Sequence, residues 1–155
     1  MNKAIDATDR RIIHQLQQNG KETIKEIADF LGMSTTPVFE RIKKLERDGF
    51  IEGYTAIVNK EKMGFQLVAF CTVTLESHHT EFINQFESDI KSLPEVMECY
   101  HIAGLFDYLL KIYSKDMVDY QNFITQKLAS ISNIGRVQSS FIMTEVKNEK
   151  VLPIF

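Results

Sequence analysis

The sequence predicts an α+β protein with two domains, at residues 1–59 and 60–155. Three segments with the apolar spacing of helices fill residues 6–48. Beyond about residue 65 the apolar residues alternate instead, as they do in strands, and strand and helix segments then follow one another to the end of the chain. A length of 155 residues allows one domain or two small ones.

The first two predicted helices have clear start and stop signals. The candidate N-caps of the first helix are Asp6, Thr8 and Asp9. That helix ends at residues 19–20, which are Asn-Gly. The second helix follows Thr23 and ends at Gly32, a residue that readily adopts the left-handed conformation of a helix end. Only a three-residue turn then precedes the third helix.

The third helix is predicted over residues 37–48, with Ser34 or Thr36 as its N-cap. Pro37 lies in the first turn, where its missing N–H removes no hydrogen bond. The side chains expected to face the core are Val38, Ile42 and Leu45. Two short helices around a tight turn, completed by an earlier helix, predict a helix-turn-helix. Residues 50–58 alternate as one extended strand or a strand pair, in the place of a wing.

The second half has the order β-α-β-β-α-β, which is the ferredoxin-like arrangement. The predicted strands are residues 67–75, 96–102, 107–113 and 137–146, and the predicted helices begin at Thr80 and at Asp116. Both faces of the first strand are apolar, yet the two helices cover only one face of such a sheet. The other face therefore needs a partner, and a second copy of the chain is the simplest one.

The outward side of the third helix carries side chains suited to DNA. Its hydroxyl, charged and flanking residues are Ser34, Thr35, Thr36, Glu40, Arg41, Lys43, Lys44 and Arg47. Hydroxyl groups at the N-terminal end of a recognition helix reach base edges and phosphates, while later lysine and arginine side chains hold the backbone. The alternative is a solvated face with ion pairs four residues apart, such as Glu40 with Lys44.

The charge balance predicts modest DNA binding by a single copy. The net charge is −3, and residues 1–59 hold 9 of the 18 basic and 9 of the 21 acidic residues. The excess of acidic groups thus belongs to the second half. Nonspecific affinity grows with the number of phosphates neutralised, so two or more copies in one complex would raise it.

Other classes of protein are disfavoured. Cys71 and Cys99 lie in apolar runs without CxxC spacing, which argues against a disulfide framework. Cys99 and His101 share a strand face but supply too few ligands for a metal site. There is no catalytic set, phosphate-binding loop, signal peptide or membrane span. We therefore expect no enzyme activity, no cofactor, no membrane association and a cytoplasmic location.

Residues 34–56, STTPVFERIKKLERDGFIEGYTA, resemble the DNA-binding half of the bacterial Lrp/AsnC (feast/famine) transcription regulators. Residues 103–110, AGLFDYLL, and 143–147, MTEVK, resemble the second half of that family. The resemblance runs from Asp6 to about Phe155 and is closest to the leucine-responsive branch. It implies a winged helix-turn-helix joined to a ferredoxin-like domain, double-stranded DNA as partner, and a nucleoid-associated protein.

The resemblance also implies dimers that assemble into octamers or similar rings and bind small effectors, often amino acids. The positions that match the effector site are Gly104, Leu105, Phe106, Asp107, Tyr108 and Ser139. The family usually has an acidic or amide residue after the glycine, whereas this chain has Leu105, which favours an apolar effector such as leucine or methionine. The alternative is that Gly104 and Asp107 only shape a turn and that Ser139 is an ordinary strand residue.

Two other functions compete with a ligand-responsive DNA-binding regulator. One is an amino-acid-sensing or protein-interaction module without DNA binding, and the other is a small-molecule enzyme on the ferredoxin-like half. Hydroxyl and basic residues on the third helix favour the regulator over the first of these. The lack of a catalytic set disfavours the second.

Overall fold

The structure is a computed structural model and describes residues 4–154. These residues form two compact units, one containing residues 4–57 with 146–154 and the other residues 58–145. The last residues therefore group with the first unit, whereas the sequence pattern predicts them to lie in the second domain. The Leu152 N–H donates to Gln17 Oε1 at 2.6 Å, and Gln17 Nε2 donates to the Leu152 carbonyl at 3.3 Å.

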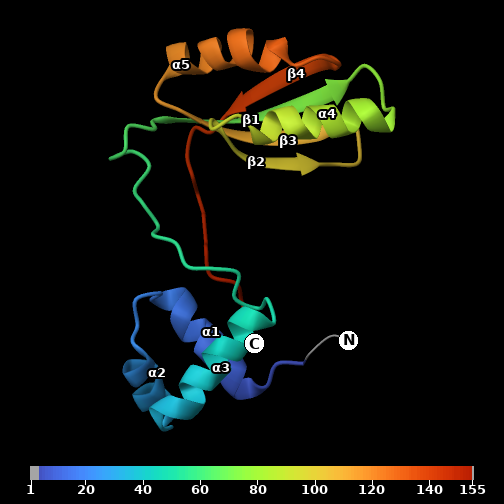
Figure 1. The fold of residues 1–155 in the computed structure, drawn as a ribbon. Helices are drawn as coiled ribbons and strands as arrows, with labels where there is room; N and C mark the ends of the chain where they lie inside the picture. The colour runs from blue at the N-terminus through green and yellow to red at the C-terminus, as the bar shows by residue number, and fades with distance from the viewer. Residues whose placement is uncertain (1–3, 155) are drawn as a thin grey trace. The chain divides into compact units, whose positions relative to one another are not determined.

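The first unit is the predicted set of three helices, α1 (Ala7–Gln18), α2 (Ile24–Leu31) and α3 (Thr35–Arg47) (Figure 1). Its buried core consists of Ile12, Ile27, Ala28, Val38, Ile42 and Leu45. Asp6 and Thr23 each form a capping box with the residue three positions on. Gly32 ends α2 with φ of 67°, as predicted for a left-handed helix end.

The prediction of one strand or a strand pair at residues 50–58 is wrong, because neither occurs there. The segment begins with a bend at residues 50–51 and has no regular secondary structure beyond it, and it pairs with no strand in the described residues. The N–H groups of Phe50 and Ile51 both donate to the Leu45 carbonyl and thereby close the end of α3. Beyond them Ile57 is 75% exposed. The alternating pattern is present in the sequence, but no strand among residues 4–154 pairs with it to form a ladder.

The second unit is a four-stranded antiparallel sheet with helices, in the predicted β-α-β-β-α-β order. The strands are β1 (Leu67–Leu75), β2 (Val96–His101), β3 (Tyr108–Ser114) and β4 (Ile134–Phe141), and their spatial order is β2-β3-β1-β4. The helices are α4 (Thr80–Lys91) and α5 (Met117–Asn122). Within residues 4–154 no helix is both long and apolar enough to cross a bilayer.

The last two elements differ from their predicted bounds. The helix predicted from Asp116 is α-helical only to Asn122 and continues as a π-helix (Phe123–Lys127) and a 3₁₀ turn (Leu128–Ser130). The last strand begins earlier than predicted because Asn133 has φ of 69° and turns the chain into β4. Its side chain holds this turn by hydrogen bonds to the N–H and the carbonyl of Ser77.

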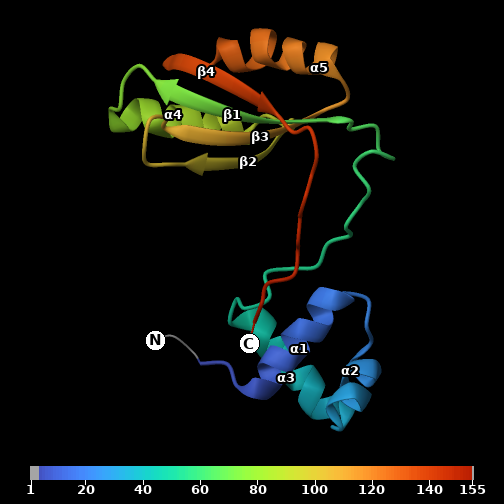
Figure 2. The same ribbon diagram turned by 180° about the vertical axis from the view of Figure 1, so that it is seen from behind.

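The two helices of the second unit pack on the same face of the sheet. Phe86 and Ile90 of α4 and Tyr120 of α5 share one buried core with Cys71 and Leu110 of the sheet. Seen from behind, the strands lie in front of α4 (Figure 2). The face that the helices leave uncovered carries Val68, which is 6% exposed, and Phe70, which is half-buried.

Candidate nucleic-acid interface and ligand-binding loop

The outward face of α3 is exposed over its whole length. The exposed members of the predicted set are Ser34, Thr35, Thr36, Glu40, Lys43, Lys44 and Arg47. Burial of Val38, Ile42 and Leu45 fixes the orientation of the helix and directs this face away from the core. Ser34 occupies the N-cap position, but its side chain makes no capping hydrogen bond. The first turn contains no acidic residue, so the positive end of the helix is open to an anion.

Two of the three basic side chains on this face, Lys43 and Arg47, form ion pairs within the domain. Lys43 Nζ lies 3.0 Å from Glu46 Oε2, and Arg47 Nε lies 3.3 Å from Asp48 Oδ1. The Lys43 hydrogen bond lowers the pKa of Glu46. Lys44 is exposed, and the ion pair with Glu40 that belongs to the alternative interpretation of this face does not occur among the described residues. The Lys43–Glu46 pair is solvent-accessible and contributes little, so Lys43 can exchange Glu46 for a DNA phosphate. Asp48 is only 3% exposed, so Arg47 also compensates a nearly buried carboxylate.

Arg41 is set apart from the other predicted DNA-binding residues. Its Nη1 atom lies 2.6 Å from Asp6 Oδ2 and 2.6 Å from Asp9 Oδ1. Hydrogen bonds to these two carboxylates raise the pKa of Arg41. The side chain therefore ties α3 to the start of α1 within the domain.

The predicted effector loop connects β2 to β3. Gly104 has φ of 145°, a conformation that favours glycine, and Leu105 is 92% exposed. Asp107 Oδ2 accepts a 2.7 Å hydrogen bond from the Leu75 N–H, and Asp107 Oδ1 lies 2.8 Å from His78 Nε2. Burial raises the pKa of Asp107, but the hydrogen bonds from Leu75 and His78 outweigh it and leave the pKa below 3.8.

Asp107 is therefore a structural link from the loop to the end of β1, and each of its oxygens already has one partner. A carboxylate offers about four acceptor positions, so capacity for a further donor remains.

Tyr108 points into the protein rather than toward the surface of the loop. It is 1% exposed, and its hydroxyl donates to Glu87 Oε1 at 3.0 Å. Its ring stacks on His101 with centroids 4.7 Å apart. Burial and the Glu87 carboxylate raise the pKa of the Tyr108 phenol strongly.

Ser139 is not brought together with the loop in a single chain. It lies on β4 opposite Cys71, whereas Tyr108 at the end of the loop lies opposite Val73. Strand β1 separates β4 from β3. The Ser139 hydroxyl accepts a hydrogen bond from the Tyr120 hydroxyl of α5.

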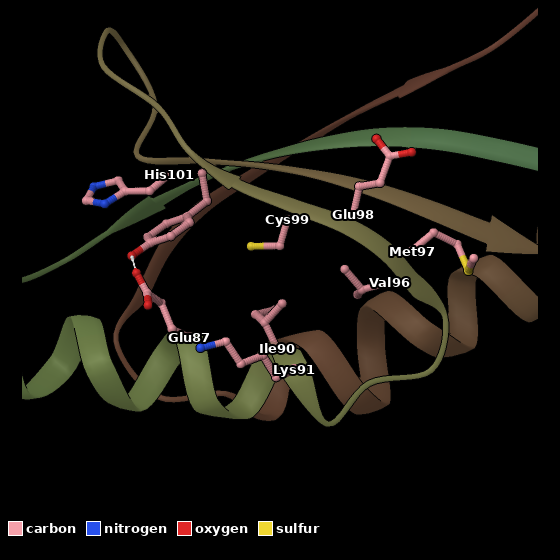
Figure 3. A pocket seen from close by; sticks show the side chains of 9 residues that line it. Glu87, Ile90, Lys91, Val96, Met97, Glu98, Cys99 and His101 are labelled. Atoms are coloured by element: carbon pink, nitrogen blue, oxygen red, sulfur yellow. Dashed lines mark hydrogen bonds between the residues drawn. The ribbon is translucent and has the colours of Figure 1, made fainter. Parts of the chain in front are cut away.

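The structure adds an open cavity that sequence reasoning missed. It has a volume of about 370 Å³ and lies between α4 and the edge strand β2 (Figure 3). Glu87 and Lys91 line it together with Cys99, His101 and Tyr108. From sequence, Glu87 and Lys91 are an ordinary helical surface pair four residues apart, so no signal distinguished them. No cluster of metal-binding side chains occurs in the part of the chain that the structure describes.

A helix-turn-helix with an exposed hydroxyl and basic face, joined to a ferredoxin-like sheet domain, defines a two-domain DNA-binding transcriptional regulator. Residues 5–52 match the family model for a winged helix-turn-helix DNA-binding domain, and residues 68–152 match that of the Lrp/AsnC ligand binding domain. The chain belongs to the Lrp/AsnC family of transcriptional regulators.

Individual relatives agree over nearly the whole length. The proline dehydrogenase transcriptional activator of Rhodobacter capsulatus is 38% identical, covering 99% of each chain. The leucine-responsive regulatory protein of Klebsiella pneumoniae is 36% identical over 98% of this chain and 93% of its own. A crystal structure of a Neisseria meningitidis transcriptional regulator in complex with L-Met superposes with a TM-score of 0.92, 31% identity and 97% coverage of both chains. These relatives are regulators and not enzymes.

Proposed function

We propose that this chain is a sequence-specific DNA-binding regulator whose DNA binding or assembly responds to a small amino acid. The observation that carries the DNA-binding part is the exposed face of α3, with hydroxyl groups at its N-terminal end and basic groups at its C-terminal end. In this arrangement α3 enters the major groove, the threonine side chains reach base edges, and Lys43, Lys44 and Arg47 contact phosphates. Such a protein acts in the bacterial cytoplasm, on the nucleoid.

An apolar amino acid is the effector class that we propose for the Gly104–Tyr108 loop. The Neisseria relative was crystallised with L-Met, and another relative is named for its response to leucine. Leu105 presents an apolar side chain at the tip of the loop. Ser139 lies away from the loop within one chain. It can therefore contribute to the effector site at the loop only if it comes from a neighbouring copy.

We also propose that copies of the chain assemble through the face of the sheet that the helices leave uncovered. The helices cover only one face, and Phe70 lies half-buried on the other. A second copy placed against this face removes that apolar surface from water. Two copies present two α3 helices, which suits a DNA site with two half-sites one turn apart. We propose that such dimers form an octamer or a similar ring.

The test is a gel shift with duplex DNA from upstream of the chain's own gene, with and without each of the twenty amino acids. We expect a retarded complex that survives excess nonspecific DNA, and a change in its affinity or stoichiometry with leucine or methionine. By linkage, that amino acid must also bind the DNA complex with altered affinity. A complex that nonspecific DNA removes entirely would contradict sequence-specific binding.

A further inference from the structure

The cavity between α4 and β2 has the size and lining of a small-molecule site. Its volume of about 370 Å³ falls within the range of roughly 300–1,000 Å³ that is usual for ligand pockets. Ile90, Val96 and Met97 give it an apolar wall. In Figure 3, Glu87, Ile90 and Lys91 lie on the α4 side, and Val96 and Cys99 on the β2 side.

The cavity is lined by two side chains of opposite charge, Glu87 and Lys91, which form no ion pair with each other. They are one helical turn apart on α4. Glu87 Oε1 accepts a hydrogen bond from the Tyr108 hydroxyl, which fixes that carboxylate, and a carboxylate has acceptor positions for further donors. Glu98 is directed away from α4 (Figure 3) and bonds Lys111 and Tyr100 instead. The cavity thus offers one acceptor group and one ammonium group beside an apolar wall.

We propose that this cavity binds an α-amino acid with an apolar side chain, at a site separate from the Gly104–Tyr108 loop. The ligand ammonium bonds the second oxygen of Glu87, and the ligand carboxylate bonds Lys91. The ligand side chain packs against the apolar wall formed by Ile90, Val96 and Met97. A zwitterion satisfies both charged groups at once, which a simple amine or a simple carboxylic acid does not.

The position of the cavity connects it to the loop. His101 and Tyr108 line it, and these two residues pair across the base of the β2–β3 hairpin. The loop of residues 102–107 extends from that base, and the Ile102 N–H closes it by donating to the Asp107 carbonyl. A ligand in the cavity therefore contacts the inner end of the hairpin, while the loop effector proposed above contacts its tip.

Cys99 provides a reporter for the cavity. The chain has two cysteines, of which Cys71 is buried and Cys99 is exposed. Although Cys99 is accessible, partial shielding from water and the Glu87 carboxylate raise the pKa of its thiol, and Lys91 acts in the opposite direction. Glu87, Lys91 and Cys99 all line the same cavity. A ligand held between Glu87 and Lys91 covers this thiol.

The experiment measures the rate at which a maleimide labels Cys99 in the intact full-length protein, by mass spectrometry, with and without leucine or methionine. At a ligand concentration ten times the dissociation constant we expect labelling to slow by about tenfold. Lys91→Met and Glu87→Gln should each abolish the protection, although glutamine still accepts the Tyr108 hydroxyl. Lys25→Met, which removes an exposed helical lysine in the other unit, should keep it. Far-UV circular dichroism of each variant checks its fold.

A variant of the loop separates the two sites. Asp107→Asn should leave the protection of Cys99 intact, because the cavity does not contain this side chain. The proposal is overturned if no amino acid slows labelling, if protection persists in both Lys91→Met and Glu87→Gln, or if Asp107→Asn removes it. Amino-acid binding by calorimetry without any protection of Cys99 would leave the proposed function standing and eliminate the cavity site.

Discussion

The guanidinium Nη1 of Arg41 lies 2.6 Å from Oδ1 of Asp9, a carboxylate whose side chain is only 3% exposed. The same nitrogen lies 2.6 Å from Asp6 Oδ2 at the start of α1. Asp9 in turn accepts from the Asp6 N–H in the capping box. Arg41 thus compensates a buried negative charge at the point where α1 and α3 meet, which predicts a contribution of this residue to stability.

We expect Arg41→Ala to lower the free energy of unfolding of the first unit by about 2 kcal/mol, because a buried carboxylate loses its charged donor. Lys44→Ala, on the exposed face of the same helix, should change it by less than about 0.5 kcal/mol. Urea denaturation followed by circular dichroism measures both values. Equal effects of the two substitutions would contradict the structural role of Arg41.

The same cluster should make the first unit sensitive to acid. The hydrogen bonds from the Asp9 N–H and from Arg41 lower the pKa of Asp6 below 3.8. Because the pKa is depressed in the folded state, its contribution to stability is fully present above pH 3.8 and is lost as the pH falls through the folded value. Asp6→Asn keeps a capping oxygen but does not titrate. The stability advantage of the wild type over this variant should therefore shrink at low pH in thermal melts, and a constant difference would contradict the assignment.

DNA binding should depend on the two adjacent lysines of α3. Replacing Lys43 and Lys44 with alanine should weaken binding to all sequences and reduce the slope of log K against log salt by about 0.9 for each phosphate that is no longer neutralised. Thr36→Val, at the N-terminal end of the same helix, should instead alter sequence preference with little change in the slope. Fluorescence anisotropy over a salt series measures both. An unchanged affinity in the double variant would refute the assignment of α3 as recognition helix.

The helices of the first unit were predictable because their signals are local. Thr23 and Gly32 mark the ends of α2 within the sequence itself, and the structure confirms both. The prediction of a strand at residues 50–58 was wrong because a strand also needs a neighbouring strand to pair with, and the local sequence pattern does not reveal one.

The side-chain contacts at the sites were not predictable for a similar reason. From sequence alone Arg41 is a flanking DNA-binding residue, because its partners Asp6 and Asp9 lie more than thirty positions earlier in the chain. The contact of Asp107 with the Leu75 N–H likewise joins residues that only the sheet topology brings together. The residue types of the loop are visible in the sequence, but the directions of their side chains depend on the tertiary structure.

Assembly should be sensitive to a charge on the uncovered face of the sheet. The structure makes Phe70 a better probe than Val68, because Val68 is already only 6% exposed within one chain and an aspartate there would disturb the fold itself. Phe70→Asp should dissociate the assembly, since it buries a carboxylate whose cross-strand neighbour Lys111 is already paired with Glu98, and a buried charge without its own partner costs several kcal/mol. Asn84→Asp, exposed on α4, is the matched control. Light scattering at micromolar concentration measures the mass, and a wild-type monomer would refute the proposed interface.

The last prediction concerns the charge of Asp107 in the loop. Alanine at this position removes the acceptor of the Leu75 N–H and the partner of His78, so Asp107→Ala changes the structure of the loop as well as its charge. Asparagine retains an oxygen for the Leu75 N–H and an amide for His78, and it removes only the negative charge. If the carboxylate holds the ammonium of an amino-acid effector, Asp107→Asn should weaken binding by about tenfold or more, equivalent to at least about 1.4 kcal/mol. Calorimetry with leucine and methionine measures this effect, and a thermal melt of the variant shows whether the loop contacts are kept. Unchanged affinity in Asp107→Asn, together with a loss in Asp107→Ala, would assign Asp107 to the geometry of the turn alone.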